Sequence, residues 1–267
     1  MMSPMKTAWK VTVSVLAALL VLLLVAEFGL RAFMAGQIRS DMASQNPETI
    51  SAEQADEAKV SFGPSPLTLG LLRGVVPHVA MTTPSTLVAQ GETYTGQPGA
   101  DISVDNLSVA DGRQVAGRLR MTTDLPDDYV RAILQEQLSS SIQGGGASFL
   151  DGLLTVSGVA SHPETGTFTV EVSDGAAAID LRPAMVNDSL TFEAASTELF
   201  GFQLPDTVTR GITSALQQGV EDAVNSEMRV TEFTVVNGAL RVTVEGENVD
   251  MEELSATGAQ PGAARVG

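Results

Sequence analysis

The run from Val11 to Leu30 constrains this chain more than any other feature. It reads VTVSVLAALLVLLLVAEFGL and carries one charge, Glu27, near its far end. A bilayer core is about 30 Å thick and a helix rises about 1.5 Å per residue, so about 20 apolar residues can span it. We therefore expect residues 11–30 to form a transmembrane anchor, which would tether the rest of the chain to a membrane.

The alternative for this run is a cleaved signal peptide, whose apolar region is usually about 7–15 residues long and ends at a small-x-small site. The uninterrupted stretch from Val11 to Ala26 is slightly longer than that. Cleavage after Ala26 or Ala35 would place Leu24 or Phe33 at the minus-three position, where a small residue is needed. The sequence therefore favours an uncleaved anchor.

Basic residues indicate the orientation of the anchor. Lys6 and Lys10 precede the apolar run, so the positive-inside rule predicts a cytoplasmic N-terminus at residues 1–10, although Arg31 and Arg39 weaken the asymmetry. With the anchor kept or cleaved, the residues from about 40 onward would lie on the extracytoplasmic, periplasmic side.

Charge excludes two classes of partner for the exported part. From Asp41 onward, 31 acidic and 11 basic residues give a net charge of −20. Such a surface is repelled by phosphate polymers, so we expect no nucleic-acid partner. The chain has no cluster of four basic residues for docking on an anionic membrane. Any lipid would have to be held by a pocket.

The chain contains no cysteine. Disulfides, thiolate nucleophiles and cysteine-ligated metals are therefore excluded. An exported chain without disulfides fits a bacterial cell envelope better than a eukaryotic secretory route.

The polarity pattern divides the rest of the chain into three parts. Residues 31–57 are polar and alanine-rich and are predicted to form a helical stalk, which Asn46-Pro47 interrupts. Residues 58–254 form the predicted domain, and its first part alternates in short runs between Gly and Pro punctuation, as antiparallel strands do. Residues 255–267 lack apolar periodicity and are predicted to be a disordered tail.

Two long amphipathic helices are predicted within the domain, at 126–143 and 205–227. Each opens with proline followed by aspartate, which suits the free amides and the positive end of a helix. Gly144 to Gly146 would end the first helix. Their apolar stripes are Val130, Ile133, Leu134 and Leu138 in the first helix, and Val208, Ile212, Leu216 and Val220 in the second.

The two helix openings also match each other at a constant offset of 79 residues. Strand-like sequence follows each of them, and Asn237-Gly238 predicts a hairpin after the second. These features suggest two copies of a helix-plus-hairpin module, near 117–195 and 196–254. The alternative is coincidence, because Leu-Pro-Asp is a common way to open a helix.

The sequence shows no catalytic or metal-binding pattern. His78 and His162 lie far apart, and neither has a second histidine at zinc-binding spacing, so we expect them to be structural or solvated. Adjacent acidic pairs such as Asp127-Asp128 point about 100° apart on a helix and are expected to form a solvated face. We therefore expect no enzyme activity, no cofactor and no metal.

A leucine-rich segment is the most informative constellation. Residues 66–74 read PLTLGLLRG in a chain whose aromatic fraction is only 4%. Thin aliphatic side chains can line a groove for acyl chains, although apolar stripes more often only pack. The candidate acyl-chain residues in this segment are Leu67, Leu69, Leu71 and Leu72.

Several motifs together resemble the LmeA-type phospholipid-binding family of actinobacterial envelopes, related in name to a lipomannan elongation factor. After the anchor, a strand leads into Phe62-Gly63-Pro64-Ser65-Pro66-Leu67 and then Leu71-Leu72-Arg73-Gly74. Leu204-Pro205 opens a helix, and a strand from Gly238 to Val249 closes the pattern. The resemblance covers roughly residues 30–254, and its motifs are structural rather than catalytic.

This resemblance implies an α+β fold and a function. The fold would be an elongated antiparallel sheet wrapped around long amphipathic helices, as in tubular lipid-binding proteins. The function would be binding of a phosphatidylinositol-type phospholipid on the outer side of the plasma membrane, in support of lipoglycan synthesis. Candidate headgroup residues are Arg73, Arg118 and Arg120, because an anionic headgroup favours arginine in an otherwise acidic protein.

The leading hypothesis is therefore a membrane-tethered, non-enzymatic phospholipid-binding module. The alternative is a scaffold or accessory protein for envelope glycosyltransferases, with a fully packed core and no bound lipid. The two differ in one observable, since only the first predicts a lipid that copurifies with the chain.

Overall fold

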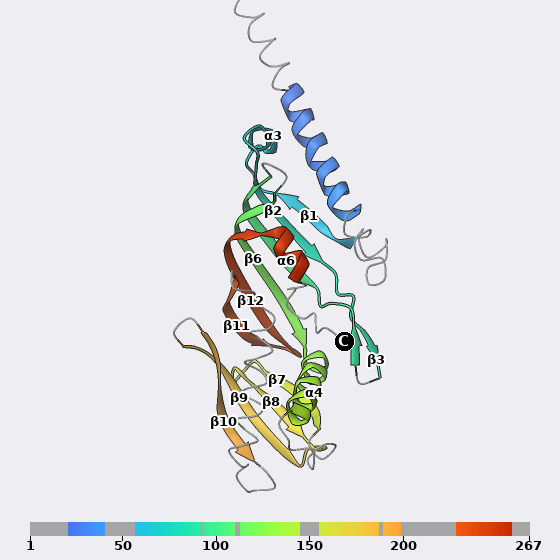
Figure 1. The fold of residues 1–267 in the computed structure, drawn as a ribbon, viewed down its shortest axis with the longest axis vertical. Coiled ribbons are helices and arrows are strands. Elements are labelled where there is room, and N and C mark those ends of the chain that lie inside the picture. The colour runs from blue at the N-terminus through green and yellow to red at the C-terminus, as the bar shows by residue number, and fades with distance from the viewer. Residues whose placement is uncertain are drawn as a thin grey trace, which may run out of the picture.

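The computed structural model shows an elongated molecule with a helix at one end and a small sheet at the other (Figure 1). The predicted helix at 205–227, with Val208, Ile212, Leu216 and Val220, lies outside the described residues, as do most of the predicted stalk and tail. The structure describes residues 21–40, 57–91, 93–109, 113–144, 155–186, 189–198 and 228–257.

The N-terminal helix, Val21–Ser40, is long and apolar enough to cross a membrane, and none of its most apolar stretch is buried. It contains the second half of the predicted anchor and continues beyond Leu30 without a break. Large side chains such as Leu22 and Phe28 are 65% and 69% exposed. Such an apolar surface on a helix requires a lipid or protein environment.

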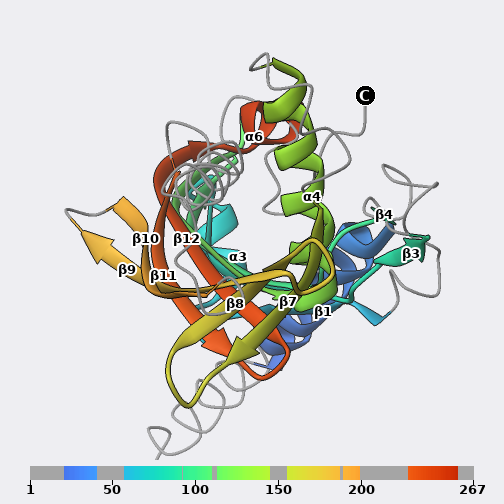
Figure 2. The ribbon, with the colours of Figure 1, turned by 90° about the horizontal axis from the view of Figure 1, so that it is seen from below.

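Most of the molecule is antiparallel sheet, which confirms the strands predicted from alternating polarity. The larger sheet has six strands in the order β1-β2-β5-β6-β12-β11. Figure 2 shows that the strands curve without closing into a barrel. Its strands are β1 (Lys59–Phe62), β2 (Val75–Thr83), β5 (Ala100–Ser108), β6 (Val115–Pro126), β12 (Ala239–Asp250) and β11 (Met228–Val236).

A four-stranded and a two-stranded sheet complete the strand content of the described chain; the six-stranded and four-stranded sheets are called the two larger sheets below. A four-stranded antiparallel sheet, ordered β10-β9-β8-β7, forms the end of the molecule far from the N-terminal helix (Figure 1). A two-stranded sheet forms a projecting hairpin. Their strands are β7 (Val156–His162), β8 (Thr167–Val172), β9 (Ala177–Val186) and β10 (Ser189–Glu198), and β3 (Val88–Gln90) and β4 (Thr93–Thr95).

Helix α4 (Asp127–Gly144) confirms the first predicted amphipathic helix, and it ends at the first glycine of the triplet. Two short helices, α3 (Leu67–Leu71) and α6 (Met251–Thr257), also occur. The predicted disordered tail, residues 255–267, therefore overlaps the end of α6. At the start of α6 the Asp250 carboxylate accepts a hydrogen bond from the amide of Glu252 at 3.0 Å.

Two parts of the predicted architecture are not shown by the structure. The described residues are mostly antiparallel sheet with few helices. Among them no sheet is wrapped around long amphipathic helices, and α4 packs beside β7 at the junction of the six-stranded and four-stranded sheets. The predicted repeat is not shown either. Strands β7 to β10 form a sheet of their own, whereas β12 pairs with β6 from Ala239 to Asp250 and so carries β11 into the larger sheet.

The predicted hairpin is confirmed. Val236 of β11 pairs with Ala239 of β12, so Asn237-Gly238 is a two-residue turn. Gly238 adopts a φ of 70°, which glycine tolerates without a steric penalty. The strand that follows this turn, β12, also pairs with β6 from Ala239 to Asp250, which is the longest pairing in the six-stranded sheet.

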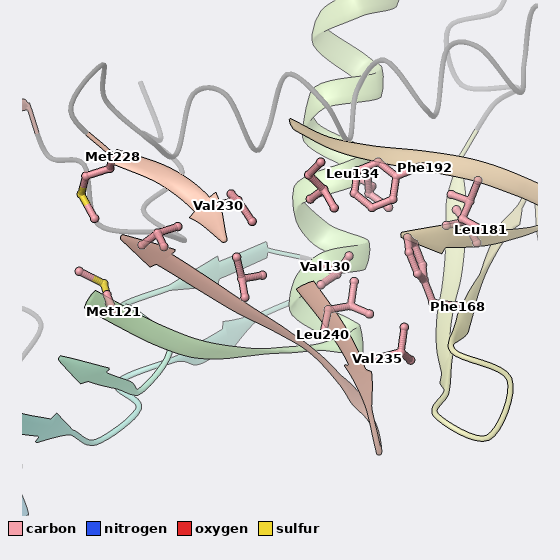
Figure 3. Close-up of a cluster of buried hydrophobic side chains, with 14 of the residues drawn as sticks. Met121, Val130, Leu134, Phe168, Leu181, Phe192, Met228, Val230, Val235 and Leu240 are labelled. Carbon is pink, nitrogen blue, oxygen red and sulfur yellow. The ribbon is translucent and has the colours of Figure 1, made fainter. Parts of the chain in front are cut away.

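One hydrophobic core runs through both larger sheets and α4. Figure 3 shows Val130 and Leu134 of α4 beside Phe168, Leu181 and Phe192 of the four-stranded sheet, with Val235 and Leu240 of the larger sheet close by. Phe192 makes edge-to-face contacts with Phe168 and Phe233, with ring centroids 5.9 and 5.5 Å apart. Since Phe233 belongs to β11, these three rings join the two sheets.

Candidate functional site

The inner face of the six-stranded sheet is mostly apolar across its width. In antiparallel pairing, directly opposed residues point to the same face, so the register identifies which side chains share it. Residues paired across neighbouring strands form rows on this face. One such row contains Thr83 and Thr123, whose hydroxyls donate to the carbonyls of Ala100 and Gly99. Two other rows are Phe62, Val79, Val104, Leu119, Gly246 and Met228, and Val60, Met81, Ile102, Met121, Val244 and Val230.

The inner face is not uniformly buried. Toward β6, β12 and β11 its side chains are part of the core, and Leu119 is fully buried. Toward the β1 and β2 edge the side chains are only half-buried. We call these half-buried residues the edge patch, which comprises Val60, Phe62, Val79, Met81 and Ile102.

Sequence reasoning missed the edge patch. Its signal is present, because apolar residues alternate in VPHVAMTT and ADISVDNLSVA. That alternation predicts one apolar face for each strand, but it does not say which apolar faces stay half-buried. The register and burial of the folded sheet supply that information.

The outer face of the same sheet carries paired charges. Arg118 and Arg120 share this face, as predicted from their parity, and both are exposed. Arg120 lies 3.0 Å from Glu245, and Arg118 lies 3.9 Å from Glu247. These two headgroup candidates thus point away from the apolar face and have carboxylate neighbours. The third candidate, Arg73, lies between α3 and β2 and is not part of a strand.

Another charge pair on this sheet joins β6 to β12. The Arg241 guanidinium donates two hydrogen bonds to the Asp124 carboxylate, at 2.6 and 2.7 Å. These hydrogen bonds lower the pKa of the Asp124 carboxyl below its ordinary value. The outer face is therefore a charged, solvated surface, and the two faces of the sheet have opposite chemical character.

The apolar stripe of α4 faces the core. Val130 and Leu134 are 5% and 3% exposed, whereas Ile133 and Leu138 are half-buried. Of these four acyl-chain candidates, Val130, Leu134 and Leu138 pack in or against the core shared by the two sheets. Beside them Tyr129 is also buried, which raises the pKa of its phenol to about 12.

The predicted leucine segment forms α3 and divides into two environments. Leu67 is 1% exposed and Leu71 is half-buried. Leu69 and Leu72 are 51% and 83% exposed, and the exposed Arg73 follows directly. The four leucines therefore do not form one surface: part of the segment anchors α3, and the rest projects from it.

A polar cluster joins α3 to the N-terminal helix. The Glu27 carboxylate accepts hydrogen bonds from the amides of Leu67 and Thr68, at 2.7 and 3.0 Å, and from the Thr68 hydroxyl at 3.0 Å. Arg31 donates to Glu27 at 2.7 Å and to the Phe62 carbonyl at 2.7 Å. The one charge of the predicted anchor is therefore fully engaged. We call this cluster the Glu27 latch; its residues are Glu27, Arg31, Phe62, Leu67 and Thr68.

The described residues contain no group of three or more His, Asp or Glu side chains that could hold a metal ion. His78 lies 2.6 Å from Asp105 on the outer face, and His162 lies 3.0 Å from the Thr169 hydroxyl. The chemical feature that this arrangement offers is an apolar sheet face, half-buried at the edge nearest the N-terminal helix.

Comparison with known proteins agrees with this chemistry. Neither the curated proteins nor the solved structures yielded a match to the chain. A family model does match, over residues 25–245, and it describes LmeA-like phospholipid-binding proteins. The match includes both the edge patch and the Glu27 latch. This chain therefore belongs to the LmeA-like phospholipid-binding family.

Proposed function

We propose that this chain is a membrane-anchored, non-enzymatic protein that binds a phosphatidylinositol-type phospholipid on the extracytoplasmic side of the cell membrane. Acyl chains would contact the apolar inner face of the six-stranded sheet at the edge patch. The anchor at residues 11–30 would hold the domain beside its lipid supply, with the N-terminus in the cytoplasm. The protein would support the synthesis of lipoglycans such as lipomannan, or another step of envelope biogenesis.

The observation that carries this proposal is the edge patch in a chain of a phospholipid-binding family. Its five side chains are adjacent by register, since Phe62 pairs with Val79, and Val60 pairs with Met81, which in turn pairs with Ile102. Each buried methylene of an acyl chain contributes about 0.8 kcal/mol, so eight of them would contribute roughly 6 kcal/mol. One partly covered chain would therefore give useful affinity.

Two features support the anchored topology. The helix Val21–Ser40 is long and apolar enough to span a membrane, and none of its most apolar stretch is buried. Lys6 and Lys10 precede the apolar run, which favours a cytoplasmic N-terminus. The rest of the chain is strongly acidic. Such a charge suits an aqueous compartment and differs from the basic surface that would dock on an anionic membrane.

Photocrosslinking tests the lipid site. The full chain is reconstituted in phosphatidylcholine vesicles that contain a trace of phosphatidylinositol with a diazirine on an acyl chain. After irradiation, crosslinked peptides are identified by mass spectrometry. We expect crosslinks in the peptides of β1, β2 and β5 that carry the edge patch, separate from those of the anchor. Unlabelled phosphatidylinositol should compete better than phosphatidylglycerol.

Two variants on one strand provide the control. Met81→Asn places an amide on the inner face and should lower crosslinking about tenfold, because a loss of about 1.4 kcal/mol corresponds to a factor of ten. Thr82→Asn is exposed on the outer face and should leave crosslinking unchanged. Crosslinking confined to anchor peptides, and equal competition by both unlabelled lipids, would contradict lipid binding by the domain. The scaffold for envelope glycosyltransferases would then be the better hypothesis.

A further inference from the structure

The most exposed large apolar side chain outside the N-terminal helix, among the residues whose exposure the structure describes, is Leu72, at 83%. Leu69 of the same short segment is 51% exposed. Both belong to α3 or its end, which connects the edge strands β1 and β2. An exposed apolar pair at the tip of a sheet indicates a surface that is covered in the working protein.

The Glu27 latch places this tip on the N-terminal helix. Glu27 lies three residues before Leu30, the last residue of the predicted anchor. At about 1.5 Å per residue, it therefore lies about 4–5 Å inside the end of the apolar segment, measured along the helix. Because Leu67 and Thr68 donate directly to Glu27, the start of α3 lies at the same level.

The tip is held firmly in this position. A Cβ added at Gly70 would lie 2.5 Å from the carbonyl oxygen of Val75 and 2.6 Å from a ring carbon of Pro77, so α3 packs on β2 without room for a side chain. Leu67 is buried beneath it. The exposed leucines therefore project from a rigid support.

The composition of the tip suits the surface of a bilayer. Residues 60–72 contain no charged side chain, in a chain whose net charge is −17. The first charge after them is Arg73, which is exposed. Leucines followed by one arginine match the order of hydrocarbon and anionic headgroups at the membrane interface.

We propose that the α3 tip inserts Leu69 and Leu72 into the outer leaflet beside the anchor, as a second membrane contact. The occupant of this apolar surface is thus the bilayer itself, reached because the Glu27 latch fixes the tip at the end of the membrane-spanning helix. The contact holds the β1 and β2 edge, with the edge patch, at the membrane surface. This inference rests on the anchored topology of the proposed function and does not depend on which lipid the domain binds.

Site-specific fluorescence tests the contact, and the absence of native cysteine makes single-cysteine labelling clean. The environment-sensitive dye NBD is attached to the full chain at Leu72→Cys, Leu69→Cys, Leu22→Cys or Thr82→Cys. The chain is reconstituted in vesicles of phosphatidylcholine and phosphatidylglycerol, with or without doxyl-labelled lipid. We expect a blue shift and quenching at positions 69 and 72, as at position 22 in the anchor, and neither at position 82.

The outcomes separate this proposal from the one on which it rests. Quenching at position 22 with a water-exposed dye at positions 69 and 72 would overturn the tip contact, leave the anchor intact and point to a protein partner for the leucines. A water-exposed dye at all positions would overturn both the contact and the anchored topology. Lipid binding at the edge patch is measured independently by photocrosslinking.

A latch variant tests the positioning. Glu27→Ala removes the acceptor of the α3 amides and should cause loss of quenching at position 72, while position 22 remains quenched. Glu57→Ala removes an exposed acidic side chain outside the latch and should change neither position. Unchanged quenching at position 72 in Glu27→Ala would show that the latch does not position the tip.

Discussion

Replacing Phe192 by alanine should weaken the joint between the two larger sheets. Its ring is 6% exposed and lies between Phe168 of β8 and Phe233 of β11, in edge-to-face contact with both. No other edge-to-face series of rings is found in the described residues, where the one remaining pair is Tyr94 with Tyr129. The substitution therefore removes contacts on both sides of the joint at once.

The magnitude follows from the burial and the two ring pairs. Truncation of a buried phenylalanine to alanine costs about 3–5 kcal/mol. Of this, each edge-to-face pair accounts for about 0.5–1.5 kcal/mol beyond its buried area. In a domain of this size 1 kcal/mol corresponds to about 2–4 °C, so Phe192→Ala should lower Tm by roughly 6–20 °C.

Thermal unfolding of the full chain in mild detergent, followed by far-ultraviolet circular dichroism, measures this effect. Val186→Ala provides the control, because Val186 is 46% exposed and should change stability by no more than about 0.5 kcal/mol. A double-mutant cycle of Phe192→Leu with Phe233→Leu should give a coupling of about 0.5–1.5 kcal/mol. A coupling near zero, or equal Tm losses for Phe192→Ala and Val186→Ala, would refute the view that these rings join the sheets.

Three further predictions concern the tip, a charge pair and a buried phenol. Gly70→Ala should destabilise α3 by about 1–3 kcal/mol through steric conflict with β2, seen as faster amide hydrogen exchange in β2, whereas Gly36→Ala, with nothing within 4 Å of the new Cβ, should not. Because Arg241 lowers the pKa of Asp124 from its ordinary value of 3.8, the pair stabilises the fold above that pH. The stability difference between the native chain and Arg241→Gln should therefore shrink as the pH falls through the lowered pKa, and a constant difference in urea denaturation would contradict the pairing. Burial should make Tyr129 ionise at about pH 12, read from absorbance at 295 nm in a variant whose other tyrosine is phenylalanine; ionisation near its ordinary value of 10.0 would contradict the burial.

Local patterns in the sequence were enough to predict several elements. The helix at 126–143 followed from its apolar period and the glycine that ends it, and α4 confirms it. The hairpin at Asn237-Gly238 followed from the turn chemistry. The common face of Arg118 and Arg120 followed from strand parity. Each of these features depends on residues that are close in the sequence.

Partners distant in the sequence could not be predicted in the same way. Period-two alternation determines which residues share a face but not which strand lies beside them, so it could not predict that β12 pairs with β6. The four leucines of the α3 segment looked equivalent, yet Leu67 is buried and Leu72 is 83% exposed. A five-residue helix is too short for an apolar period to reveal this difference.

The sequence by itself determined that an apolar helix precedes an acidic, cysteine-free domain of antiparallel strands, because length, charge and alternation are properties of the chain. Only the tertiary structure decided what Glu27 does. In the sequence Glu27 is a lone acid in an apolar segment. In the fold its carboxylate accepts hydrogen bonds from the amides of Leu67 and Thr68 and forms an ion pair with Arg31. A carboxylate in such an apolar segment is stable only when donors surround it. The donors of α3 lie 40 residues away in the sequence, so only folding brings them to Glu27.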